Sequence, residues 1–469
     1  MMRYKSSGVV KGATMENKHT MSDLYQMQSM SLNDKIRMTK YRIKEWVNTY
    51  GEDGVYVSFS GGKDSTVLAD IVRNVCGYKN IPLVFVDVPT QYPELKQFAM
   101  TFDNLVILKP KISFAEVCEK YGFPLISKEI SEKAMYSRKY LKKYLEINTI
   151  TTDRQTDRQE IPYAFAIADF IGVDRRNKKN KEIIQEIKMG NIPNELLDKI
   201  FGIDSEAPMK ARCIFGTVVH KENGVATDEV SKMYDYSKYK FLINAPFDVS
   251  NQCCNVMKKQ PIHEYAKKTG RFPITAVMAS ESKLRTQKWL QNGCNGFEMK
   301  NPISNPMSFW TEQDVLLYIK ENADRMINNS WRIKPKKEDV MKYGNRIVYR
   351  TTGGTAPYYT KEYGAICSVY GDVVTDYKSM GQCENQMSFA DYGIFDNERP
   401  LLKTTGCTRT GCVLCGFGCH LEKEPNRFQM LKETHPKFHN LLYVLKNNGV
   451  TYAEAIDWVN EHGNMNIKY

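Results

Sequence analysis

A short apolar strand that runs directly into a pair of glycines constrains this chain more than any other feature. Residues Val55–Ser60 read VYVSFS, a run typical of a β-strand, and Gly61 and Gly62 end it. Residues Asp64–Cys76 then place apolar side chains at helical spacing. This order predicts a loop whose backbone can approach a phosphate closely, with the first N–H groups of a helix facing that anion.

The side chains of the loop suit an anion as well as its backbone does. Lys63 adds a positive charge, and Ser60 and Ser65 add hydroxyl groups. We expect Lys63 to stabilise charge on a phosphate and Asp64 to help position a magnesium ion. The alternatives are a turn that only reverses the chain, a helix cap at Asp64 and a solvated lysine. The spacing differs from the Walker A pattern G-x-x-x-x-G-K, so another kind of nucleotide loop is expected.

The apolar runs that follow predict a parallel sheet. Pro82–Val88 and Leu105–Leu108 are short and almost wholly apolar, and segments with helical spacing separate them. Alternation of strands and helices indicates a sheet covered by helices on both faces. Further strands are expected at Phe241–Ala245 and Ile274–Met278, and a capped amphipathic helix at 31–50.

Changes of composition divide the 469 residues into three parts. We expect a disordered or variable tail at 1–30, a nucleotide-binding domain at 31–310 and a C-terminal region of helices and loops at 311–469. Within the second part, the stretch at about 129–240 is lysine-rich and mostly helical, which predicts an insertion into the domain. The alternatives for this stretch are a lid and an element that sets specificity.

The charge of the chain favours anionic partners. The formal net charge is +12 at pH 7, so nucleotides, sulfate esters, DNA or RNA are expected to bind. The alternative is a lysine-rich solvated surface. The sequence has no apolar run of about 18 residues, and its N-terminal residues lack the apolar core of a secretory signal. We therefore expect a cytoplasmic protein with no membrane partner.

The 12 cysteines predict metal binding or redox chemistry, because disulfides are rare in a reducing compartment. Two are adjacent at Cys253 and Cys254, and four fall within Cys407–Cys419. Four thiolates suit an iron–sulfur cluster or zinc. The four cysteines of the second group, Cys407, Cys412, Cys415 and Cys419, could hold such a centre alone. Buried reduced cysteines without a metal are the alternative.

The loop Ser60–Ser65, SGGKDS, resembles the PP-loop of the adenine nucleotide α-hydrolase superfamily. That superfamily includes N-type ATP pyrophosphatases, tRNA thiolation enzymes and reductases of adenylyl sulfate (APS) and phosphoadenylyl sulfate (PAPS). The resemblance implies an α/β fold with a doubly wound parallel sheet and with nucleotide at the carboxyl ends of its strands. The helical insertion and a Cys-rich, mostly helical C-terminal region would be added to that sheet.

Three further segments resemble the PAPS/APS reductase family. Phe85–Glu94 is similar to its second strand and Pro-Glu loop, Ala276–Arg285 to its G-[IV]-R-x-x-E-S-x-x-R segment, and Trp310–Ile319 to its W-x-x-x-D-V-x-x-Y-I pattern. Met278 replaces the first arginine of that segment, which implies a substrate other than PAPS. Arg285 remains available for an anion and is a candidate catalytic residue. The resemblance implies that the nucleotide is bound by Ser58, Ser60, Gly61, Gly62, Lys63, Asp64, Ser65, Asp87, Glu281 and Ser282.

The cysteine segments also resemble this family. Cys253–Pro261 is similar to the C-C-x-x-x-K-x-x-P of APS reductases, whose paired cysteines join a later C-x-x-C around a 4Fe–4S cluster. Arg409–Gly418 resembles reductase-family proteins and the R-x-G-C-x-x-C of DndC, a DNA phosphorothioation sulfurtransferase. Cys419 is a candidate nucleophile, because a thiolate there could attack sulfur. The resemblance implies the cluster ligands Cys253, Cys254, Cys412 and Cys415.

Three functions remain open from the sequence. The first is reduction of APS or PAPS by attack of a thiolate on sulfur, with an electron donor protein. The second is adenylation of a nucleic acid or other acceptor by ATP, followed by sulfur transfer from a donor protein. The third is a non-catalytic DNA- or RNA-binding protein that uses the cluster as a redox sensor. The intact loop favours the two enzymes over a basic surface alone.

Overall fold

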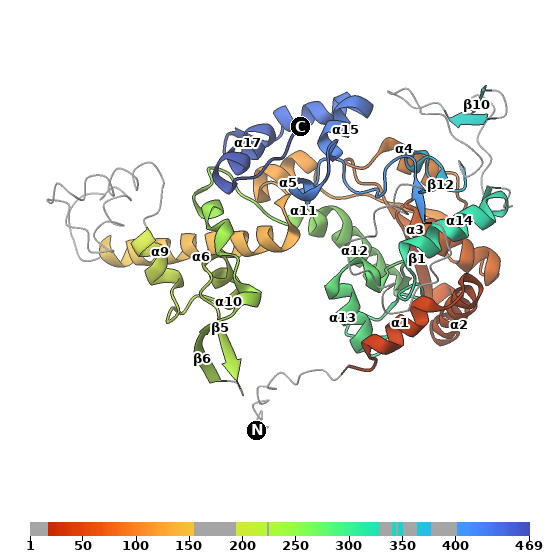
Figure 1. Cartoon of the computed structure of the whole chain (residues 1–469), viewed down its shortest axis with the longest axis horizontal. Coiled ribbons are helices and arrows are strands. Elements are labelled where there is room, and N and C mark those ends of the chain that lie inside the picture. Colours follow the sequence, from red (N-terminus) through yellow and green to blue (C-terminus); the bar gives the residue numbers. More distant parts are fainter. Residues whose placement is uncertain are drawn as a thin grey trace, which may run out of the picture. The chain divides into compact units, whose positions relative to one another are not determined.

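The computed structural model describes residues 17–153, 194–222, 225–327, 340–343, 346–349, 364–376 and 401–469. The chain forms two compact units (Figure 1), the first from Met1–Pro110 and Gln260–Gly411, the second from Lys111–Lys259 and Cys412–Tyr469. The stretch expected as an insertion at about 129–240 falls within the second unit. The C-terminal region expected at 311–469 is divided between the two units, because the chain passes from one to the other after Gly411.

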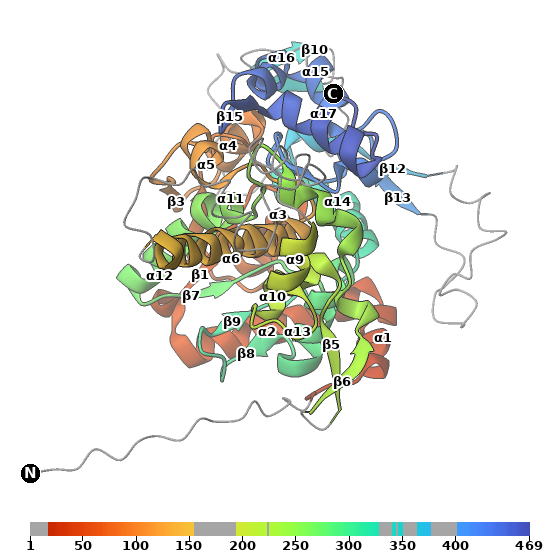
Figure 2. The same ribbon diagram turned by 90° about the vertical axis from the view of Figure 1, so that its left-hand side faces the viewer.

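A six-stranded sheet in the order β3–β2–β1–β7–β9–β8 forms the centre of the first unit. All neighbouring strands pair in parallel except β8, which is antiparallel to β9, so the sheet has the predicted α/β character. Figure 2 shows β1 and β7 side by side. The strands are β1 (Val55–Phe59), β2 (Leu83–Val86), β3 (Leu105–Leu108), β7 (Phe272–Ile274), β8 (Asn295–Gly296) and β9 (Ile303–Ser304).

Helices cover both faces of this sheet. On one face, alternate residues of β1 such as Val57 join a buried core that includes Trp46 of α2 and Trp310. On the other face, Tyr56 packs edge-on against Tyr265 of α12, with ring centroids 5.4 Å apart. The doubly wound arrangement is therefore confirmed. The helices of this unit include α2 (Leu32–Tyr50), α3 (Lys63–Asp70), α12 (Gln260–Thr269), α13 (Lys283–Asn292) and α14 (Glu312–Ile327).

A short helix, α1 (Met21–Ser29), lies in the stretch expected to be a disordered or variable tail. The Thr20 hydroxyl accepts from the N–H of Asp23 at 3.2 Å, and the Asp23 carboxylate accepts from the N–H of Thr20 at 2.7 Å. This reciprocal capping box stabilises the first turn. The sequence shows little apolar periodicity there, and Leu24 is correspondingly the one buried residue along this helix.

The strand expected at Phe241–Ala245 is wrong. These residues belong largely to a 3₁₀ helix, η6 (Ser237–Asn244), in the second unit. Arg138 of α6 (Lys128–Asp153) donates to the backbone carbonyl of Ala245 at 2.8 Å. A side chain thus supplies a hydrogen bond that a neighbouring strand would otherwise provide. In the first unit, β7 includes only Ile274 of the second expected strand.

The described part of the second unit is mostly helical. The long helix α6 packs against α10 (Figure 2). β4 (Leu125–Ile126) pairs in parallel with β14 (Gly416–Phe417), which joins the two chain segments of this unit. Its other elements are α5 (Phe114–Tyr121), α9 (Asn194–Phe201), α10 (Met209–Arg212), β5 (Val219–Glu222), β6 (Val225–Val230), α11 (Gln252–Cys254), α15 (Arg427–Thr434), α16 (Pro436–His439) and α17 (Tyr452–Gly463). None of the helices among the described residues combines the length and the apolar composition that crossing a membrane requires.

Candidate nucleotide site and thiol cluster

The loop between β1 and α3 is held by its own backbone and hydroxyl groups. Gly61 has a φ of 74°, and a Cβ there would lie 3.2 Å from the carbonyl oxygen of Leu95. Glycine is therefore required on conformational and steric grounds. The N–H of Gly62 donates to the Ser60 hydroxyl at 3.2 Å, and the Ser65 hydroxyl lies 3.0 Å from that of Ser60. Both predicted hydroxyl groups thus help to shape the loop.

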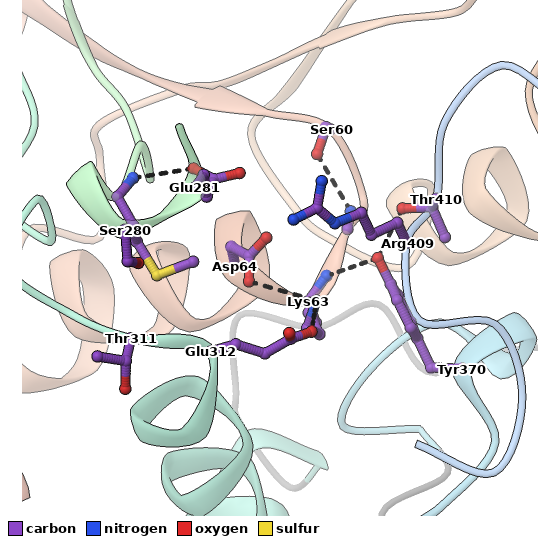
Figure 3. A pocket seen from close by; sticks show the side chains of 12 residues that line it. Ser60, Lys63, Asp64, Ser280, Glu281, Thr311, Glu312, Tyr370, Arg409 and Thr410 are labelled. Carbon is purple, nitrogen blue, oxygen red and sulfur yellow. Dashed lines mark hydrogen bonds and ion pairs between the residues drawn. The ribbon is translucent and has the colours of Figure 1, made fainter. Parts of the chain in front are cut away.

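A cavity of about 320 Å³ opens beside this loop, entirely within the first unit (Figure 3). Its volume falls in the range of small-molecule sites, ~300–1,000 Å³. The walls come from the loop, from the turn η8 (Ala279–Glu281) and the residue before it, from the start of α14, and from two later segments of the chain. The predicted nucleotide residues that line the cavity are Ser60, Gly62, Lys63, Asp64 and Glu281.

Lys63 is buried in the cavity wall, with 4% of its surface exposed. Its ammonium lies 3.1 Å from the Glu312 carboxylate and 3.7 Å from that of Asp64. The same ammonium donates to the carbonyl oxygen of Thr408 at 3.1 Å. A buried charge needs such partners because its desolvation is expensive. The Lys63 ammonium therefore already has carboxylate partners within the protein.

The carboxyl group of Asp64 is poorly compensated. Burial raises its pKa and the charge of Glu312 adds to this effect, against the opposing charges of Lys63 and Arg409. Its Oδ1 atom is buried and accepts no hydrogen bond from the described residues, although the Lys63 ammonium lies 3.7 Å from it. An ionised carboxylate in this position would be stabilised by an added cation. A magnesium ion, which prefers oxygen ligands, fits this environment.

The segment after β7 shapes another side of the cavity. The N–H of Met278 donates to the Glu281 carboxylate at 3.0 Å, and Glu281 also pairs with Arg285. Met278 is buried and lines the cavity, where it presents an apolar side chain in place of an arginine. The predicted anion-binding group of Arg285 is therefore engaged by a neighbouring carboxylate. Ser282 caps α13 by accepting from the N–H of Arg285 at 3.4 Å.

Other residues that the resemblance implied do not line the cavity. Asp87 pairs with Lys96 at 2.6 Å. Ser65 is buried, and its hydroxyl donates to the carbonyl oxygen of Gly62 at 2.9 Å. The predicted nucleotide or catalytic residues of the first unit that lie outside the lining are Ser58, Gly61, Ser65, Asp87, Ser282 and Arg285.

The sequence did not single out several residues that the fold brings to the cavity. Glu312 is the first residue of α14, in a segment that the sequence linked only to the family pattern at Trp310–Ile319. Arg409 and Thr410 belong to a run that the sequence linked only to the cysteines. Tyr370 lies in a segment without a recognisable pattern, and its hydroxyl accepts from the N–H of Lys63 at 3.2 Å.

The predicted cluster ligands lie near one another in the second unit. The neighbouring Cys253 thiol lowers the pKa of Cys254, with help from nearby lysines. The Cys254 thiol, followed by burial, raises the pKa of Cys253, and the charges of Cys412 and Cys415 also contribute. Because these thiols affect one another's pKa, the four sulfur atoms lie close together.

Lys258 lies among these thiols, in the π-helical turn η7 (Asn255–Lys259). Burial opposes its charge, but Cys412, Cys254 and Cys415 together raise its pKa above the usual value. Four thiolates with a compensating ammonium have the donor chemistry of an iron–sulfur site. In the described parts of the chain, no three Cys, His, Asp or Glu side chains are arranged as a site for a metal ion. The cluster therefore stays a prediction.

Two further cysteines bear on the predicted chemistry. Cys419 is 1% exposed, and burial raises its pKa to about 12, so its thiol stays protonated near neutral pH. Such an environment does not activate a nucleophile. Cys407 belongs to the first unit, and burial raises its pKa to about 12 although Lys63 opposes this. Among the residues that the structure describes, no cysteine lines the cavity.

The fold and the cavity define an α/β protein in which the loop after the strand β1 bounds a site of small-molecule dimensions. Residues 54–164 match the model of the phosphoadenosine phosphosulfate reductase domain. The matched residues include the loop Ser60–Ser65 and the segment Phe85–Glu94, which resemble that family. The match extends into α6, within the stretch expected as an insertion, and covers less than half of the chain. Comparisons with curated proteins and with solved structures found no match.

Proposed function

We propose that the chain is an enzyme of sulfur metabolism that binds an adenine nucleotide in this cavity, and that the nucleotide is ATP. The observation that supports this most directly is the set of charges around one cavity. Lys63 and Arg409 provide positive groups for phosphate, and Asp64, Glu281 and Glu312 provide carboxylates. A site with both signs of charge suits a phosphate chain that carries a magnesium ion.

Magnesium is the proposed partner of Asp64 and Glu312. The buried Oδ1 of Asp64 accepts no hydrogen bond among the described residues and has the Lys63 ammonium at 3.7 Å, and burial raises the pKa of Asp64. When bound, the ion would neutralise charge on the phosphate chain. This need for a cation favours ATP over APS or PAPS.

In the proposed reaction, an oxygen atom of the acceptor attacks the α-phosphorus of ATP. The bond from that phosphorus to the bridging oxygen breaks, pyrophosphate leaves, and the acceptor proton passes to solvent. Lys63 stabilises the charge that develops on the phosphate oxygens. The outer sulfur of a donor-protein persulfide then displaces AMP, which joins acceptor and donor by a disulfide bond. A second thiol of the donor attacks the donor sulfur of that bond, releases the thiolated acceptor and leaves a disulfide in the donor. The net charge of +12 supports a polyanionic acceptor such as DNA or RNA.

Reduction of APS or PAPS is the second candidate, and the description of the matching family favours it. That reaction needs a thiolate close to the sulfur atom of the bound nucleotide. No cysteine lines the cavity within the described residues, and Cys419 is buried with a raised pKa. We therefore rank reduction of APS or PAPS below adenylation by ATP as the proposed function.

The proposed 4Fe–4S cluster would be held by Cys253, Cys254, Cys412 and Cys415. When bound, it would supply a soft centre for electron or sulfur chemistry. Lys258 would compensate part of the negative charge of the thiolates, as its raised pKa indicates. The lowered pKa of Cys254 favours the deprotonated form that a metal centre requires.

The test is to purify the protein without oxygen and to incubate it with Mg²⁺ and, separately, with ATP, APS and PAPS. Pyrophosphate from ATP, in the presence of a nucleic acid acceptor, is the expected product. Sulfite from APS or PAPS would instead establish the reductase. Absence of both products would favour the non-catalytic redox sensor. Lys96→Gln serves as a control for Lys63→Gln, because Lys96 lies in a surface ion pair and does not line the cavity.

A further inference from the structure

Both donors that Lys63 would offer to a phosphate are already engaged. Its backbone N–H, the first of α3, donates to the Tyr370 hydroxyl at 3.2 Å, and its ammonium lies 3.1 Å from Glu312. Backbone N–H groups at the start of a helix are the groups that bind phosphate in loops of this kind. The Tyr370 oxygen therefore accepts a hydrogen bond that a phosphate oxygen would otherwise accept (Figure 3).

Tyr370 is held firmly in this position. It is 2% exposed, and its hydroxyl lies 2.6 Å from that of Thr410. Its backbone carbonyl accepts from the N–H of Gly406 at 2.8 Å. The Lys63 ammonium lies 5.6 Å from the centre of its ring, within the range of a cation–π contact. Backbone and side chain thus both fix the hydroxyl at the loop.

The absence of a side chain at Gly62 makes this contact possible. A Cβ there would lie 3.1 Å from the Tyr370 hydroxyl and 3.1 Å from the Thr410 hydroxyl. Glycine would allow a phosphate to approach the backbone closely at this position. Here the hydroxyl groups of Tyr370 and Thr410 occupy that space instead. Burial raises the pKa of Tyr370, so the group is a neutral hydroxyl that can accept one hydrogen bond and donate another.

We propose that the Tyr370 hydroxyl is a built-in competitor for the phosphate groups of the nucleotide, and that it sets the affinity of the site by holding the Lys63 N–H until a phosphate replaces it. This inference rests on the proposed nucleotide function. Thr410 keeps the displaced hydroxyl satisfied, since the two oxygens already form a hydrogen bond. Ligands without phosphate do not need this N–H, so the competition is specific to phosphorylated ligands.

The test is the affinity for ATP, measured by calorimetric titration of the full chain and of Tyr370→Phe. This change keeps the ring and removes only the competing oxygen. Since one hydrogen bond contributes modestly to stability, ATP should bind about 2- to 10-fold more tightly to the variant. Affinity for adenosine, which carries no phosphate, should not change. Unchanged or weaker binding of ATP would overturn the proposal.

A matched control is Tyr318→Phe. The Tyr318 hydroxyl is also buried and has two partners, Asp70 at 2.5 Å and Arg325 at 2.7 Å, but it does not line the cavity. ATP affinity should be the same in this variant as in the original chain. If the original chain and Tyr370→Phe bind ATP with equal affinity, only the proposed role of the Tyr370 hydroxyl is overturned. If neither protein binds ATP, the proposed nucleotide function is overturned as well.

A second readout does not depend on the stability of Tyr370→Phe. Fluorotyrosine placed at position 370 of the full chain reports on the surroundings of this ring by ¹⁹F NMR. ATP should shift its resonance, because the hydroxyl must leave the Lys63 N–H, and adenosine should not. A resonance that ATP leaves unchanged, in protein that binds ATP, would contradict the proposal.

Discussion

The ammonium of Lys35 lies 2.7 Å from the Asp314 carboxylate, and the fold buries both side chains. Lys35 comes from α2 and Asp314 from the first turn of α14. The same carboxylate accepts from the N–H of Thr311 at 2.7 Å, so it also caps α14. This ion pair thus fixes the helix start that carries Glu312 to the cavity.

We predict that Asp314→Asn strongly destabilises the first unit. The change breaks a buried ion pair by removing the charge of one member, which costs about 3–5 kcal/mol. Urea unfolding measures the loss in free energy of unfolding. Glu298→Gln is the matched control, because its ion pair with Lys18 is exposed and should contribute little. Equal stability of the two variants would show that the buried pair does not hold α14.

Asp64→Asn should separate stability from activity. Burial raises the pKa of Asp64, so the folded chain holds a proton there that the unfolded chain releases at lower pH. Stability therefore falls as pH rises through the window between the usual value of 3.8 and the raised pKa, and it stays lowered above that window. The amide has no charge to bury, so the variant should unfold at a higher temperature at neutral pH.

This gain should disappear below pH 3.8, where the carboxyl is protonated in both states. Activity should move in the opposite direction. Loss of a magnesium ligand should reduce pyrophosphate release at least about tenfold. Asp53→Asn, at a fully exposed position, should change neither property. A destabilised Asp64→Asn protein would contradict the proposed lack of compensation at this carboxylate.

The two possible ligand sets for the cluster give different results on cysteine substitution. Cys254→Ser should remove most of the iron and the visible absorbance, because its lowered pKa and its neighbours indicate a metal ligand. Cys407→Ser should retain both, since Cys407 is not among the ligands that the resemblance implies. Iron analysis of protein prepared without oxygen measures the difference. Loss of iron in Cys407→Ser with retention in Cys254→Ser would favour the other set.

The local pattern of the sequence predicted much of the fold. The strand, glycine turn and helix from Val55 onward are confirmed, as are the strands β2 and β3 and the cap of α2 at Ser31. These elements depend on residues that are neighbours in the chain. The strand expected at Phe241–Ala245 was wrong because a short apolar run does not distinguish a strand from a helical turn.

The cavity could be predicted only in part for a related reason. Lys63 and Asp64 belong to a recognisable loop, whereas Tyr370 and Arg409 reach it from segments far away in the sequence. No periodicity or spacing connects such residues before the fold is known. The resemblance also implied Asp87, which the structure places in an ion pair with Lys96.

In the proposed function, the cavity beside Gly62 holds the phosphate chain of ATP. The most direct measurement is the equilibrium affinity for Mg²⁺-ATP of the original chain, of Lys63→Gln and of Lys96→Gln. Since hydrogen bonds to charged groups contribute about 1.5–3 kcal/mol, Lys63→Gln should bind roughly 10- to 150-fold more weakly, and Lys96→Gln should bind as the original chain does. Equal affinity of all three proteins, or no binding by the original chain, would contradict the account.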